Sequence, residues 1–336
     1  FGVFLLVVMR HVRVLAGAHR GGSVARDRVP RRLWGVFLYA IAQVRMFRDH
    51  RAGAMHYALF LGSTILLIGN ANAVTGGILE AVVGWPLEGA LWALLIAIQN
   101  LVALGALAGV AYAFERRLVS RPRRLLFTRT ALIILTAILA VVTTEFVALA
   151  FEAARWADIP GAFATNALAV PLRSLDPSVT ETGFALFWWG HIAVLSAFVI
   201  YIPFNKHFHV YTSFVNVYLR KLTPRGQLPA MDLEAESQTF GVRTIADLGW
   251  KDLLDGFTCT ECGRCTDACP ANATGKSLDP RAMILGIRHL AVDAERGLNL
   301  IPNSPLVRET YGLDDRLAPA ALAIPIVDAA IPYDAV

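Results

Sequence analysis

The stretch Thr130-Ala-Leu-Ile-Ile-Leu-Thr-Ala-Ile-Leu-Ala-Val-Val-Thr-Thr-Glu-Phe-Val-Ala-Leu-Ala-Phe151 is largely apolar and contains a single charged residue, Glu145. A helix needs about 20 such residues to cross roughly 30 Å of hydrocarbon, so this stretch predicts a membrane-spanning helix. Stretches of the same kind lie at residues 57–77, 89–114 and 183–204. A fifth begins at Phe1 without an initiating methionine or a charged n-region, and we interpret it as the end of a truncated span.

The composition of the whole chain agrees with this interpretation. The sequence has 336 residues, of which 56% are hydrophobic and 17% are charged, and its mean hydropathy is +0.52. These values are too apolar for a soluble protein of this size, so we expect the lipid bilayer to be a partner. No basic patch is interleaved with aromatic residues, and we therefore expect no nucleic-acid partner.

Loop charges orient the predicted spans, because Lys and Arg are retained on the cytoplasmic side. Arginines crowd the segments 13–51 and 116–129, whereas the other two connections carry few. The pattern predicts a multi-pass protein of the cytoplasmic (inner) membrane with its N-terminus outside. The last span then ends inside, which places residues 238–336 in the cytoplasm.

The predicted organisation has three parts. Residues 1–209 are expected to form an all-α transmembrane bundle of five helices, the first one truncated. Residues 210–237 are expected to form an amphipathic interfacial segment and a linker, because the sequence turns polar and contains Pro224, Gly226 and Pro229. Residues 238–336 are expected to form a small, incomplete α-helical ferredoxin-type iron–sulfur domain, in which Asp279-Pro280 opens a helix.

All four cysteines of the chain lie in one run, Cys259, Cys262, Cys265 and Cys269, and Pro270 follows the last of them. This is the C-x2-C-x2-C-x3-C-P spacing of bacterial ferredoxins, in which three cysteines hold one cluster and the fourth serves another. A zinc knuckle or a disulfide pair is the alternative. We predict that Cys259, Cys262 and Cys265 bind a first [4Fe–4S] cluster and that Cys269 binds a second. Further ligands must then come from other subunits or from sequence that follows.

Three histidines are candidate cofactor ligands. His191 and His209 are about five helical turns apart on one face, too far to share an iron. His56 begins the second predicted span at about the depth of His209, so these two could hold an inner b-type haem between helices. The alternative is that both are interfacial histidines bonded to water or lipid phosphate. His11 is expected to be solvated or to face lipid.

The outer half of the predicted bundle offers His191 and Glu145, which are costly residues inside a span. No second histidine is found at the depth of His191, so this residue could contact a quinone head group or serve a possible outer haem. Glu145 could exchange protons with the quinone, or it could simply bond to Thr143 or Thr144. Asn70, Asn72, Gln99 and Asn100 are expected to make helix-to-helix hydrogen bonds rather than to act as ligands.

Two groups of segments carry a family resemblance. The segments 51–56, 188–191 and 205–209 resemble the cytochrome b anchor related to the gamma subunit of respiratory nitrate reductase. The segments 257–271 and 276–280 resemble membrane-bound heterodisulfide-reductase-like iron–sulfur oxidoreductases, which include electron-transfer-flavoprotein:menaquinone oxidoreductases.

The resemblance implies a cytochrome b anchor fused to a two-cluster ferredoxin module. By analogy His56 and His209 would ligate the inner haem b and His191 the outer one, while Leu66 stands near the family's second histidine on that helix. The implied function is electron transfer between a cytosolic donor, such as an electron-transfer flavoprotein, and menaquinone. The alternatives are a quinol-dependent thiol/disulfide reductase and a non-catalytic iron–sulfur anchor subunit.

Overall fold

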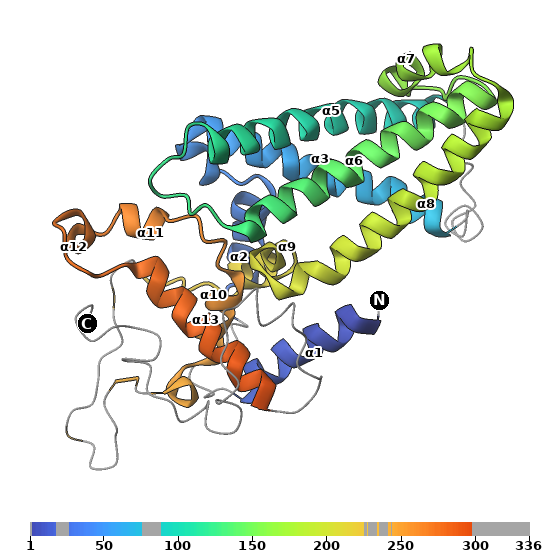
Figure 1. The fold of residues 1–336 in the computed structure, drawn as a ribbon. Helices are drawn as coiled ribbons and strands as arrows, with labels where there is room; N and C mark the ends of the chain where they lie inside the picture. Colours follow the sequence, from blue (N-terminus) through green and yellow to red (C-terminus); the bar gives the residue numbers. More distant parts are fainter. Residues whose placement is uncertain are drawn as a thin grey trace. The chain divides into compact units, whose positions relative to one another are not determined.

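The computed structural model describes residues 2–17, 27–75, 89–224 and 244–297, with four isolated positions between 224 and 244. Most of the predicted linker and the tail after residue 297 lie outside these residues. Within the described part the regular structure is helical and no strand occurs (Figure 1). Contacts divide the chain into two units. Unit 1 comprises residues 1–42, 123–126 and 200–336, and unit 2 comprises residues 43–122 and 127–199. The predicted boundaries at 209 and 237 stay a prediction.

Unit 2 contains the long apolar helices. Its elements are η2 (Met46–Arg48), α3 (His50–Thr75), α5 (Ala90–Leu118), α6 (Arg129–Arg155), α7 (Phe163–Leu172) and most of α8 (Pro177–Tyr201). In the described part of the chain, three segments are long and apolar enough to cross a membrane, namely Ala90–Leu118, Arg129–Arg155 and Pro177–Phe204. They correspond to three of the predicted spans, and α3 covers most of a fourth. These helices indicate a membrane protein, whereas one bundle of five spans stays a prediction.

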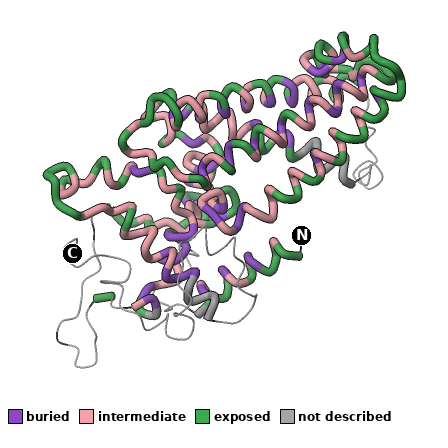
Figure 2. Tube along the Cα trace, viewed as in Figure 1, coloured by how far each residue is buried: buried purple, intermediate pink, exposed green. Residues whose placement is uncertain are grey.

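Small side chains let the helices of unit 2 approach closely. Helix α3 packs along α5, and α6 packs on both α5 and α7. A Cβ atom added to Gly62 of α3 would lie 2.7 Å from the Cβ of Ala106 on α5, so the two backbones meet where neither side chain is large. Leu66, Val142 and Phe146 complete the core around this contact. Figure 2 shows buried and exposed positions alternating along these helices.

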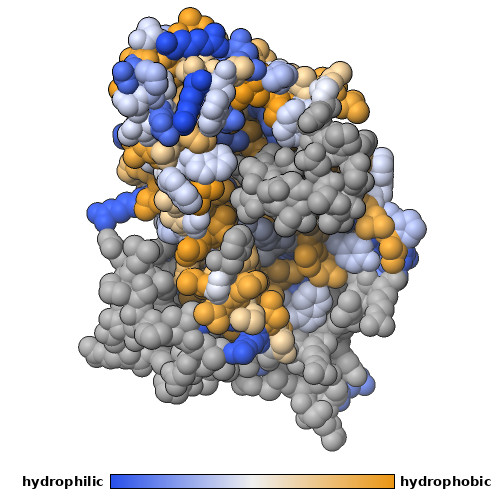
Figure 3. Space-filling view, turned by 90° about the vertical axis from the view of Figure 1, so that its right-hand side faces the viewer, coloured by the Kyte–Doolittle hydropathy of each residue, from blue (hydrophilic) through white to orange (hydrophobic). Residues whose placement is uncertain are grey.

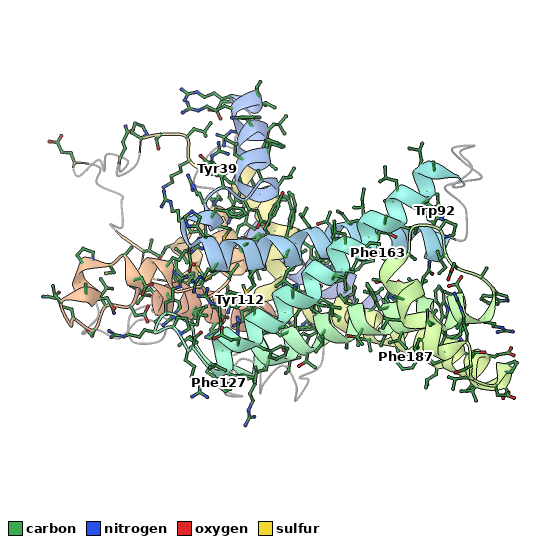
Figure 4. All side chains as sticks on the ribbon, turned by 90° about the horizontal axis from the view of Figure 1, so that it is seen from above. Tyr39, Trp92, Tyr112, Phe127, Phe163 and Phe187 are labelled. Atoms are coloured by element: carbon green, nitrogen blue, oxygen red, sulfur yellow. The ribbon has the colours of Figure 1, made fainter. Side chains whose placement is uncertain are left out.

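A buried polar contact in unit 2 joins two of its helices. The Asn100 side-chain oxygen accepts hydrogen bonds from the backbone amides of Ala164 and Thr165 at 3.2 Å each and from the Thr165 hydroxyl at 3.1 Å. The first amides of a helix have no partner within the helix, so Asn100 of α5 caps α7. The predicted helix-to-helix bond is therefore confirmed for Asn100, whereas the buried Nε2 of Gln99 has no hydrogen-bond partner among the described residues. Figure 4 shows Trp92 and Phe163 at this end of unit 2, and Tyr112 and Phe127 at the other.

Apolar side chains are also exposed on the outside of unit 2. Leu101 is 63% exposed, Leu186 66% and Trp189 68%. Many of the side chains on the face drawn in Figure 3 are likewise apolar. Large apolar residues on the outer face of long helices are what lipid contact requires.

Unit 1 combines the two ends of the described chain. Its elements are α1 (Gly2–Gly17), α2 (Val29–Val36), η1 (Phe37–Ile41), η3 (Ile202–Phe204), η4 (Lys206–Phe208), α9 (His209–Tyr218), η5 (Ile245–Asp247), α10 (Trp250–Thr258), α11 (Arg264–Asp267), α12 (Pro270–Ala273) and α13 (Pro280–Gly297). Helix α10 packs against α1, α9 and α13. Thus α1, the expected truncated span, packs against the helices that flank the cysteine run.

Candidate iron–sulfur and haem sites

The cysteine run forms a loop followed by two short helices. Cys259 follows α10, Cys262 lies in the loop, Cys265 lies in α11 and Cys269 precedes α12. No disulfide joins any of them, and Cys262 and Cys265 are exposed. The loop curls because Glu261 and Gly263 both have left-handed backbone conformations, with φ of 59° and 73°.

Glycine is required at position 263 not only for its left-handed backbone but also for lack of space. A Cβ atom there would lie 2.4 Å from the backbone oxygen of Arg124, so any side chain would collide with the main chain. The same Arg124 oxygen accepts a hydrogen bond from the Arg281 guanidinium at 2.8 Å. The cysteine loop is thus held between residue 124 and the start of α13.

Two ion pairs fix the loop at Glu261. One carboxylate oxygen is 2.8 Å from Lys206 Nζ, and the other is 2.6 Å from Arg288 Nη2. Burial alone would raise the pKa of this carboxyl, but Lys206 and Arg288 outweigh it and hold the pKa of Glu261 below its usual value. Arg288 also donates a hydrogen bond to the backbone oxygen of Cys259 at 3.2 Å.

The donor set fits an iron–sulfur cluster by its chemistry. Cysteine thiolates are the ligands of such clusters, and Cys262 and Cys265 are accessible to an incoming cluster. Burial raises the pKa of the Cys259 thiol, so ligation by iron would supply the stabilisation that its thiolate lacks. In the described chain, no three side chains of the kinds that bind metals are gathered closely enough to hold a single metal ion.

His56 is oriented by a residue that the sequence did not single out. Its Nδ1 lies 2.8 Å from the side-chain oxygen of Gln43. Gln43 is buried and has a left-handed backbone with φ of 50°, which is uncommon for a residue other than glycine. Because an amide oxygen only accepts, His56 carries its proton on Nδ1.

His209 has the same arrangement in unit 1. Its Nδ1 lies 2.9 Å from the backbone oxygen of Lys206 and therefore carries the proton. Burial lowers the pKa of His209 and outweighs the opposing effect of this hydrogen bond. The imidazole is therefore held in the neutral form that binds metals.

His191 is only 3% exposed and is turned toward α6. Its Nδ1 lies 3.0 Å from the backbone oxygen of Val141 and 3.2 Å from the hydroxyl of Thr144. Glu145 follows Thr144 directly, and its buried Oε2 has no hydrogen-bond partner among the described residues. The Thr144 hydroxyl bonds to Ala140 and Val141 as well as to His191, and no bond to Glu145 is found there.

The three predicted haem histidines therefore share one tautomer, with the proton on Nδ1. Histidines that ligate a metal usually donate their other ring N–H to a carbonyl or carboxylate oxygen, which orients the ring. This protonation leaves Nε2 of His56, His191 and His209 as the ring nitrogen with a lone pair for a metal. His11 differs, because it is its Nε2 that lies 3.0 Å from the Pro203 oxygen.

His11 lies in the interior of unit 1 and not at the surface, where the sequence analysis expected it. It is 5% exposed, and its ring lies 4.6 Å from that of Phe257 and 5.1 Å from that of Phe208. The expectation that it is solvated or faces lipid is wrong. It packs inside unit 1 because α1 lies against α10, a tertiary contact that charge and hydropathy do not reveal.

Membrane-type helices together with a ferredoxin-type cysteine run define a class, that of membrane-associated iron–sulfur proteins. Among curated proteins, the chain is 30% identical over 300 residues to the EtfAB:quinone oxidoreductase of Syntrophomonas wolfei, which covers 82% of this chain and 40% of that protein. It is 29% identical over 315 residues to the probable iron-sulfur-binding oxidoreductase FadF of Bacillus subtilis, covering 91% and 43% respectively.

A shorter similarity concerns a ferredoxin. Over 57 residues the chain is 40% identical to a probable membrane-anchored ferredoxin of Chromohalobacter salexigens, covering 17% of this chain and 8% of that protein. No family model and no solved structure matches the chain. The chain spans about two fifths of the length of the two oxidoreductases. The resemblance to iron–sulfur oxidoreductases is thus supported over most of this chain.

Proposed function

We propose that the chain is the membrane part and the first ferredoxin half of an oxidoreductase that transfers electrons between a cytosolic flavoprotein and menaquinone. The observation that carries the proposal is the ferredoxin spacing of Cys259, Cys262, Cys265 and Cys269 in a chain similar over most of its length to an EtfAB:quinone oxidoreductase. When bound, iron–sulfur clusters and haem accept and release single electrons.

The cysteines divide between two clusters in this proposal. Cys259, Cys262 and Cys265 hold the first [4Fe–4S] cluster, and Cys269 turns to the second because Pro270 begins a new helix directly after it. The remaining ligands come from another part of the protein or from another subunit. The ion pairs of Glu261 keep the loop that bears the first three cysteines in one conformation.

The histidines hold haem b. His56 and His209 ligate the inner haem, supported by the matching protonation of their rings at Nδ1. His191 either ligates an outer haem or donates a hydrogen bond to a quinone. Glu145 supplies or accepts the quinone proton; the support is that it follows the hydroxyl that contacts His191 and that its buried Oε2 has no hydrogen-bond partner among the described residues.

A topology follows from the arginine-rich connections. The cysteine run faces the cytoplasm, where a flavoprotein can reach it and where thiols stay reduced. The N-terminus of the chain lies outside. Cysteine-accessibility labelling of intact cells, with single cysteines placed in the 116–129 and 173–176 segments, would test this orientation.

A second candidate is a membrane-anchored ferredoxin without quinone chemistry of its own. The observation that favours it is the similarity of 57 residues to a protein of that description. Menaquinone reduction by the purified protein separates the two candidates, because only the first requires it.

The test of the proposal is spectroscopic. The purified protein should contain iron and acid-labile sulfide, show a [4Fe–4S] signal by electron paramagnetic resonance after reduction, and show a b-type band in its reduced-minus-oxidised absorption spectrum. Cys262→Ser should abolish the signal of the first cluster, whereas Thr260→Ala in the same loop should retain it. A preparation of the folded wild-type protein without iron or haem contradicts the proposal.

A further inference from the structure

Lys206 contacts a candidate haem ligand and the cysteine loop, both of which lie in unit 1. Its backbone oxygen accepts the hydrogen bond from His209 Nδ1 at 2.9 Å, and its ammonium group lies 2.8 Å from a Glu261 carboxylate oxygen. Glu261 stands between Cys259 and Cys262 in the sequence. One residue therefore joins a candidate haem ligand to the loop of the candidate first cluster.

The contact continues to the other side of the loop. Arg288 pairs with the second oxygen of Glu261 at 2.6 Å and donates to the Cys259 backbone oxygen at 3.2 Å. The side chains of Lys206 and Glu261 are each 13% exposed, and that of Arg288 is 7% exposed. Charges so far removed from water interact strongly and are little screened by salt.

The segment that bears Lys206 is itself held in place. The Asn205 side chain accepts a hydrogen bond from the His207 amide at 2.8 Å and donates one to the Tyr201 oxygen at 2.6 Å. The Asn205 hydrogen bonds fix the backbone before and after residue 206, and the ion pair with Glu261 fixes the Lys206 ammonium group. The backbone carbonyl of Lys206 therefore has little freedom to rotate. The orientation of the His209 ring depends on that carbonyl.

We propose that Lys206 is a positioning residue that couples the haem ligand His209 to the first iron–sulfur cluster. The proposal rests on the function proposed above and adds a property to it, namely that the two cofactors respond together to one ion pair. A change at Glu261 reaches the haem through Lys206, and a change at Lys206 reaches the cluster through Glu261.

The charges predict the sign of each response. Lys206, Glu261 and Arg288 carry two positive charges and one negative charge beside the cysteine loop. A nearby positive charge favours the reduced, more negative state of a cluster. Lys206→Met should therefore lower the reduction potential of the first cluster, and Glu261→Gln should raise it.

The experiment measures both cofactors in the same preparations of the whole protein. Cluster potentials are measured by redox titration with electron paramagnetic resonance, and haem potentials by optical titration. In Lys206→Met, the haem potential or the haem ligand-field signal should change together with the fall in cluster potential. Lys206→Arg, which keeps the charge, should return both toward wild type.

Lys251→Met provides the matched control. Lys251 pairs with Asp255 at 2.7 Å in the same unit, one turn along α10, and it contacts neither candidate cofactor site in the structure. This variant should leave both potentials unchanged.

The outcomes separate the coupling from the proposed function. If the wild type binds both cofactors and Lys206→Met shifts the cluster while the haem is unaffected, the coupling is overturned and the electron-transfer function stands. If the wild type binds no haem, both are overturned. If Lys206→Met fails to bind cofactors, Lys206→Arg is used to decide. Recovery of both the cluster signal and the haem signal in Lys206→Arg supports the coupling, and recovery of only one of them overturns it.

Discussion

Glu261 and Glu145 are the same residue type in opposite surroundings. Glu261 in unit 1 has a cation on each carboxylate oxygen, whereas the buried Oε2 of Glu145 in unit 2 has no partner in the described part of the chain. A carboxylate between two cations is held ionised and acts as a fixed charge. A buried carboxyl group without a neighbouring cation can gain or lose its proton when its surroundings change. The first carboxylate therefore suits the maintenance of structure and the second suits proton exchange.

Replacement of Glu261 should have the largest effect on stability. Glu261→Ala leaves Lys206 and Arg288 buried without their counter-charge, and removal of one partner from a buried ion pair costs about 3–5 kcal/mol. We expect a loss of this size in the free energy of unfolding of unit 1, measured by chemical denaturation in detergent. A loss below about 1 kcal/mol, the range typical of exposed pairs, would show that the pairs behave as surface pairs.

Glu145→Gln should change the rate of quinone reduction and leave the stability largely unchanged. The amide has the same shape as the carboxyl and removes no ion pair, so we expect the stability to change little. If Glu145 transfers the quinone proton, the rate of menaquinone reduction should fall on the order of 100-fold, while the first cluster is still reduced at the wild-type rate. Glu152→Gln, seven positions along the same helix, is the control. An unchanged quinone rate in Glu145→Gln assigns the residue a structural role only.

Helix caps in the two units should contribute less to stability. Asp279 accepts hydrogen bonds from the amides of Arg281 and Ala282 at 2.9 and 3.2 Å at the start of α13. Thr128 accepts one from Ala131 at 3.3 Å at the start of α6. Replacement of either by Ala should cost about 1 kcal/mol. The charged cap should cost more, because a carboxylate also interacts with the helix dipole, and thermal unfolding of the two variants would measure the difference.

The helices could be predicted where a local sequence pattern, such as a continuous apolar stretch or an Asp-Pro pair, determines them. Continuous hydropathy predicted helical spans at 89–114, 130–151 and 183–204, and the helices Ala90–Leu118, Arg129–Arg155 and Pro177–Tyr201 occupy these positions. Asp279-Pro280 predicted the start of α13, and the structure confirms it. Before the cysteine run, residues 245–247 form a 3-10 turn, and α10 begins at Trp250.

The side-chain environment of the sites was not predictable in the same way. Gln43 approaches His56 through a left-handed backbone, and no local pattern marks a glutamine for that conformation. Lys206 and Glu261 are 55 positions apart, so their pairing depends on tertiary packing. His11 was wrongly expected at the surface for the same reason. The ligand assignments of His56, His191, His209 and the four cysteines stay predictions.

The contact of Gly263 with the Arg124 carbonyl has a consequence for biogenesis. Arg124 lies between α5 and α6, so it leaves the ribosome long before the cysteines do. The cysteine loop therefore acquires this support only when the connection at residues 123–126 has taken its final conformation. A substitution that disturbs this connection should therefore lower the iron content of the protein, although it changes no cysteine.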